Sequence, residues 1–119
     1  MRIMILILIA AVHSLFSVAP TSAEMLDDCS HAPTIATLRA CIQHAINNGD
    51  IDTVGVGRSL LTKLDTAQKS VDRGQPVAAL NQLNAFINEL DAQAGKHITI
   101  DHATHLRLHA QHVIAVLHG

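Results

Sequence analysis

Four stretches of the chain repeat apolar residues at steps of three and four, and a glycine follows each of the first three. This spacing places an apolar stripe on one side of a helix, whereas a half-buried strand would alternate apolar and polar residues. The stripes are Ile35, Leu38, Ile42 and Ala45; Leu60, Leu61, Leu64, Ala67 and Val71; Leu80, Leu83, Phe86, Ile87, Leu90 and Ala94; and Ala103, Leu106, Ala110, Val113 and Leu117. Because short links join them, the sequence predicts an all-α, up-and-down four-helix bundle.

Residues at the ends of the first two stretches predict where those helices begin and end. The first helix is expected over residues 34–48, and Gly49 ends it because glycine readily takes the left-handed conformation found after helices. Asp52 or Thr53 is able to cap the second helix, which is expected to continue up to Gly74. The two helices are therefore joined by a short loop.

The last two helices have similar end signals. Pro76 suits the first turn of the third helix, where its missing N–H costs nothing, and Gly95 stops that helix. Thr99 is expected to cap the fourth helix, with Asp101 in its first turn, where a negative charge suits the helix dipole. Residues 34–119 are therefore predicted to form a single four-helix domain.

The N-terminal segment has the features of a secretory signal peptide. Residues 1–23 contain Arg2, an apolar run over residues 3–12, and the small-residue triplet Thr21-Ser22-Ala23. The run is shorter than the roughly 20 residues that a membrane-spanning helix needs. The sequence predicts export to a periplasm or to the extracellular space, with cleavage after Ala23 and membrane contact only through the cleaved signal peptide. A membrane anchor is the alternative.

Cys29 and Cys41 are the only cysteines. In an exported chain, two cysteines most simply form one disulfide. The bond would hold a leader of residues 24–33 along the first helix and would stabilise the domain by about 3 kcal/mol on a chain-entropy estimate. A reactive thiol is the alternative.

Charge and composition argue against several functions. Without residues 1–23 the chain has seven Lys and Arg against ten Asp and Glu, and Phe86 is its one aromatic residue. A nucleic-acid surface needs cationic charge and usually stacking rings, so no nucleic-acid partner is expected. Ser59 and Ser70 lie inside predicted helices, and the carboxylates are scattered singly. We therefore expect no catalytic residues and no enzymatic activity.

The segment from Gly49 to Ile114 resembles the FIMAH domain, a small helical module of exported bacterial proteins. The matching residues are Gly49, Ile51, GVGRSLLTKLDTA (55–67), Gly74, LNQLNAFINELDAQAGKHIT (80–99), Ala103, Leu106, Ala110 and Ile114. The resemblance implies an all-helical, non-catalytic module and carries no catalytic residues to transfer. The chain departs from the family pattern in its last helix, which is rich in histidine.

Five histidines lie within HITIDHATHLRLHAQH, residues 97–112. On a helix, His102, His105, His109 and His112 fall within an arc of about 80° beside the apolar stripe. Imidazole is a good ligand for zinc, copper or nickel, so these four residues are the candidate metal ligands. They extend over about 15 Å of helix, whereas zinc–nitrogen bonds are about 2 Å long. One ion therefore cannot use all four, and His97, His31, His44 or a carboxylate would have to complete a site.

Three interpretations of the histidines stay open. Their rings are solvated or pack beside the core, or they bind a divalent metal, or they sense pH. Protonation of the eight histidines after residue 23 would take the net charge from −3 to as much as +5. Repulsion between these charges predicts that the fourth helix loosens in mild acid.

We therefore expect a non-enzymatic exported module that acts by contact with another protein or a cell-envelope component, without a cofactor. The alternative is a histidine-based protein that binds or buffers divalent metal ions.

Overall fold

The computed structural model describes residues 32–119. The predicted signal peptide, most of the predicted leader, Cys29 and His31 lie outside the described residues. The described part forms four helices: α2 over Ile35–Asn48, α3 over Val54–Asp72, α4 over Pro76–Gln93 and α5 over Ile100–His118. Within it, no helix combines the length and apolarity needed to cross a membrane.

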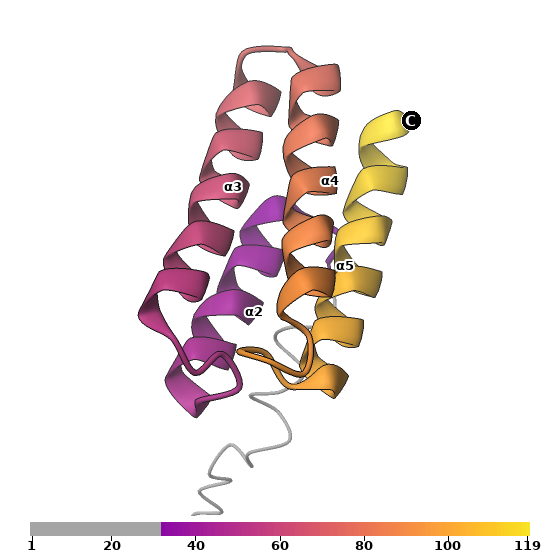
Figure 1. Ribbon diagram of the computed structural model, residues 1–119. Helices are drawn as coiled ribbons and strands as arrows, with labels where there is room; N and C mark the ends of the chain where they lie inside the picture. Colours follow the sequence, from indigo (N-terminus) through magenta and orange to yellow (C-terminus); the bar gives the residue numbers. More distant parts are fainter. Residues whose placement is uncertain (1–31) are drawn as a thin grey trace, which may run out of the picture.

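The helices run alternately up and down, and helices that follow one another in the chain pack side by side, while α2 also packs against α5 and closes the ring (Figure 1). This arrangement confirms the predicted up-and-down four-helix bundle. Figure 1 also shows that the α3–α4 hairpin extends beyond α2, which is the shortest helix at 14 residues. The closing interface between α2 and α5 therefore covers only part of the length of α5.

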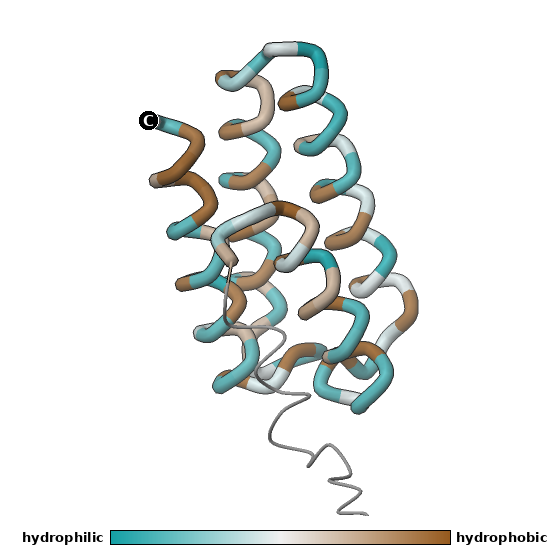
Figure 2. Tube along the Cα trace, turned by 180° about the vertical axis from the view of Figure 1, so that it is seen from behind, coloured by the Kyte–Doolittle hydropathy of each residue, from teal (hydrophilic) through white to brown (hydrophobic). Residues whose placement is uncertain are grey.

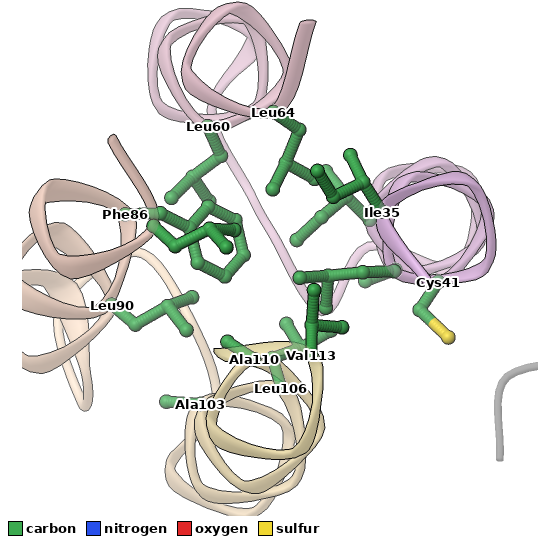
Figure 3. Close-up of a cluster of buried hydrophobic side chains, with 14 of the residues drawn as sticks. Ile35, Cys41, Leu60, Leu64, Phe86, Leu90, Ala103, Leu106, Ala110 and Val113 are labelled. Carbon is green, nitrogen blue, oxygen red and sulfur yellow. The ribbon is translucent and has the colours of Figure 1, made fainter. Parts of the chain in front are cut away.

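One apolar core fills the space between the helices (Figure 3). Phe86 lies at its centre, fully buried, and every residue of the four predicted stripes is buried or half-buried. Figure 2 shows the same pattern along the helices, with hydrophobic and hydrophilic residues alternating around each turn. Burial of these side chains is the main contribution to stability, at roughly 25 cal/mol per Å² of apolar surface.

The two loops at one end of the bundle pair with each other. An antiparallel bridge joins Ile51, between α2 and α3, to Ile98, between α4 and α5. The N–H of Asp52 donates to the carbonyl of His97 at 3.0 Å, and the N–H of Thr99 donates to the carbonyl of Asp50 at 3.0 Å. Ile51 and Ile98 are both buried. Because neither residue belongs to a helical stripe, helical periodicity does not predict their burial.

The helix boundaries agree with the predictions, and two of the predicted cap residues occupy the N-cap positions without making the expected side-chain hydrogen bond. Thr34 does cap α2, through a hydrogen bond that the N–H of Thr37 donates to its hydroxyl. Thr53 and Thr99 precede α3 and α5, yet neither side chain accepts a capping hydrogen bond. The Thr99 hydroxyl lies 3.1 Å from Nδ1 of His102 instead. The Thr53 hydroxyl is buried with no hydrogen-bond partner among the described residues.

Candidate functional site

His109 lies on the side of α5 that turns toward α2, where its ring contacts Thr37 and Cys41. Residues three or four apart share a helix face, so Thr37 and Cys41 lie on one face of α2. This face meets His109 of α5 along the outside of the interface between the two helices. We call this surface the α2–α5 seam. It is formed by Thr37 and Cys41 from α2 and by His109 from α5.

His109 is the buried histidine of the seam, with 8% of its surface exposed. Its Nε2 lies 3.0 Å from the carbonyl oxygen of Ala32 and 3.3 Å from the Thr37 hydroxyl, and its Nδ1 lies 3.7 Å from Sγ of Cys41. A carbonyl oxygen can only accept, so the geometry assigns a proton to Nε2. His109 therefore joins α5 both to α2 and to the residues that lead into α2.

Cys41 is buried at the same place, on the edge of the core. Figure 3 shows its sulfur directed away from the cluster of apolar side chains that fills the bundle. Its exposure is 3%. The predicted disulfide partner, Cys29, lies outside the described residues, so that disulfide stays a prediction.

His102 and His97 each lie beside an aspartate of the opposite loop. Nε2 of His102 is 3.3 Å from Oδ2 of Asp50, and Nδ1 of His97 is 2.9 Å from Oδ1 of Asp52. These contacts flank the bridge between Ile51 and Ile98. When the imidazoles are protonated, both contacts become ion pairs that hold the two loops together.

His105 and His112 are exposed to solvent. The four candidate ligands therefore face different surroundings. His102 contacts the loop residue Asp50, His109 contacts Ala32, and His105 and His112 face solvent. Among residues 32–119, no three His, Cys, Asp or Glu side chains are grouped so that they could hold a metal ion. His31, which was also considered as a ligand, lies outside that range.

The other three helix interfaces are crossed by ion pairs between formally charged side chains. These pairs are Arg39–Asp65 at 2.7 Å between α2 and α3, Lys63–Glu89 at 2.7 Å between α3 and α4, and Arg107–Asp91 at 3.2 Å between α5 and α4. The hydrogen bond from Arg39 lowers the pKa of Asp65 below its ordinary value, because it favours the charged carboxylate. The interface between α2 and α5 instead uses the imidazole of His109 as its polar link.

A polar cluster that the sequence pattern does not predict lies between α3 and α4. The hydroxyl of Ser59 donates to Glu89 at 2.9 Å and accepts from Lys63 at 3.0 Å. The oxygen of Ser59 thus faces the ammonium group of Lys63, and its hydroxyl proton points to the carboxylate of Glu89. This arrangement ties the two helices together. Its sequence signal is weak, because Ser59 and Lys63 are one helical turn apart and Glu89 comes from a different helix.

Comparison with known proteins agrees with this architecture. A family model described as the FIMAH domain matches residues 35–115, which include α2 to α4 and most of α5. The resemblance predicted from Gly49 onward is confirmed, and it extends to the first helix. No curated protein and no solved structure matches the chain. Since the match covers well over half of its length, the chain belongs to the FIMAH domain family.

Proposed function

We propose that the protein is a non-enzymatic exported module that acts by contact, through the outer face of α5, with another protein or a component of the cell envelope. The observation that carries this proposal is the exposure of Leu108 and Val116, at 51% and 58%. Leu108 lies in the middle of α5 and Val116 in its last turn, two turns further along, with the exposed residues His112 and Ala115 between them in the sequence.

The other exposed large aliphatic side chains of residues 32–119 are placed differently. Val54 and Ile100 are the first residues of their helices, and Val77 is the second residue of α4. Single exposed aliphatic residues at helix ends are ordinary in monomeric proteins. Leu108 and Val116 instead lie on one helix and have imidazoles beside them, not Lys or Glu. They therefore form a more suitable contact surface than single aliphatic residues at helix ends. Family membership supports the same proposal, because the FIMAH domain is a small helical module.

The proposal is tested by co-sedimentation of the purified protein with isolated bacterial envelope. We expect Leu108→Glu and Val116→Glu each to reduce the bound fraction several-fold, because a buried carboxylate opposes docking. Val77→Glu is the control, since Val77 is also exposed, at 69%, but lies at the α3–α4 hairpin. Circular dichroism checks that all three variants are folded.

Equal loss of binding in Val77→Glu would contradict a specific role for α5. If the unmodified protein does not sediment with the envelope, the envelope is excluded as the partner. Contact with another protein is then the remaining form of the proposal. A photo-crosslinker placed at Gln111 then decides that form, because absence of any cross-linked protein in the exporting cell would overturn it.

A further inference from the structure

Helix α2 ends in an asparagine–glycine pair that is open to solvent. Asn48 is the last residue of the helix, and Gly49 follows it with φ of 81° and ψ of 9°. Both residues are exposed, and no atom beyond the neighbouring residues lies within 4 Å of the position that a Cβ of Gly49 would occupy. Water therefore reaches this pair without displacing another side chain.

The side chain of Asn48 lies on the outer surface of α2. Its amide nitrogen is 2.8 Å from Nε2 of His44, one helical turn earlier. Asparagine is one of the chemically labile residues of proteins. Its lability arises because the backbone nitrogen of the next residue can attack the amide carbon Cγ and close a five-membered ring. At Asn48 the next residue is Gly49, which has no side chain to hinder that attack.

The reaction needs only water as a co-reactant. The nitrogen of Gly49 forms a bond to Cγ of Asn48, and the bond from Cγ to the amide nitrogen breaks. That nitrogen leaves as ammonia with the proton that Gly49 loses, and a cyclic imide remains. Water then adds to one of the two ring carbonyls, whose bond to the Gly49 nitrogen breaks while the nitrogen regains a proton. Opening at Cγ gives aspartate, and opening at the main-chain carbonyl gives isoaspartate.

Backbone hydrogen bonds at the end of α2 oppose ring closure only weakly. The N–H of Gly49 donates to the carbonyls of Ala45 and Ile46, the latter at 3.2 Å. The carbonyl of Ala45 also accepts from the N–H groups of Asp50 and Ile51, at 2.9 and 3.2 Å. Release of the Gly49 N–H therefore leaves Ala45 with two donors, which keep the following loop in place.

Rotation of the peptide plane between Asn48 and Gly49 brings the attacking nitrogen toward Cγ. This rotation changes ψ of Asn48 and φ of Gly49 in opposite senses, so the flanking chain moves little. Because glycine has no Cβ, Gly49 accepts φ values that other residues reach only at a cost. The folded protein can therefore reach the reactive geometry without unfolding a helix.

We propose that Asn48 is a modification site, at which the folded protein deamidates through a cyclic imide formed with Gly49. The site lies at the C-terminal end of α2, so this proposal does not depend on which partner binds the outer face of α5.

The isoaspartate product changes the main chain at the point where α2 ends. The chain then continues through the side chain of residue 48, which adds one carbon before Gly49. The N–H groups of Gly49, Asp50 and Ile51 lose the spacing that pairs them with the last turn of α2. Ile51 is also bridged to Ile98. Deamidation is therefore expected to loosen both loops at this end of the bundle as the protein ages.

Incubation of the purified protein in mildly alkaline buffer, followed by peptide mass spectrometry, tests the proposal. The reference is a synthetic peptide of residues 42–52, which is too short to hold a helix in water. We expect Asn48 to react about two- to fifteen-fold more slowly in the protein than in the peptide, the factor for breaking one hydrogen bond. A reaction that required unfolding of the whole domain would be slower than in the peptide by at least about a thousand-fold.

Two controls identify the site. Asn47 is the internal control, because it is followed by Asn48 and not by glycine. Asn48→Gln is the matched variant, since the longer side chain would have to close a less favourable six-membered ring. The thermal midpoint should fall with incubation in the unmodified protein and stay constant in Asn48→Gln. A deficit relative to the peptide larger than about fifteen-fold would show that more than one hydrogen bond must break, and would overturn the proposal. Equal deamidation of Asn47 and Asn48 would also overturn it.

Discussion

His109 contributes both a hydrogen bond and packing volume to the interface that closes the bundle. Replacing it with alanine leaves the carbonyl of Ala32 with one donor fewer and opens a cavity beside Cys41. We expect His109→Ala to lower the free energy of unfolding by about 2 kcal/mol. His105→Ala removes an exposed ring from the same helix, and should change stability by no more than about 0.5 kcal/mol. Urea denaturation of both variants measures the difference, and equal midpoints would show that His109 has no structural role.

Asp65 gives the second prediction at the scale of single residues, concerning pH. The hydrogen bond from Arg39 lowers its pKa, so the pair adds stability above the ordinary aspartate range and loses it as the pH falls below about 4. Both side chains are nearly half exposed, and we therefore expect a contribution of only about 0.5 kcal/mol at neutral pH.

The measurement for Asp65 is the urea midpoint of Asp65→Asn at pH 7 and at pH 3. The variant should be less stable than the unmodified protein at pH 7 and equal to it at pH 3. Asp72→Asn is the control, because Asp72 contacts Gln68 within the same helix. An equal deficit of Asp65→Asn at both pH values would contradict the assignment.

At the scale of helices and loops, two glycines with opposite expected effects test how the ends of α2 and α3 are formed. Gly49 ends α2 with φ of 81°, a left-handed conformation that costs an L residue about 1 kcal/mol. Gly55 lies in the first turn of α3 with open space around it, so alanine there should add about 0.5 kcal/mol through better helix propensity. The thermal midpoint should fall for Gly49→Ala and rise for Gly55→Ala. A rise for both would show that Gly49 does not need its left-handed conformation.

The sequence predicted the helices better than the loops that join them, for a physical reason. Each stripe repeats one signal over several turns, so an error at a single position does not hide the helix. The loop contact between Ile51 and Ile98 has no such repetition, because it pairs single residues that are far apart in the chain. Thr53 and Thr99 are N-cap residues as predicted, but their side chains make no capping hydrogen bond, for a similar reason. The orientation of one hydroxyl depends on its neighbours in space, and Thr99 has His102 beside it.

Across the whole molecule, the histidines show what a linear pattern can and cannot predict. Their helical spacing predicts a stripe on one side of α5. It could not indicate what faces each ring, because Asp50 and Ala32 come from other segments of the chain. The predicted loosening of α5 in mild acid stays a prediction. The contacts of His97 and His102 with aspartates oppose it, since protonation there creates ion pairs.

We expect the histidines of α5 to serve separate contacts along the helix and not to gather around an ion. Calorimetric titration of the purified protein with zinc tests this claim most directly, with the variant His105→Ala with His109→Ala as comparison. We expect weak binding without defined stoichiometry, of similar strength in the unmodified protein and the variant. Binding of one zinc ion per chain with sub-micromolar affinity, lost in the variant, would contradict the account and favour the metal-binding alternative.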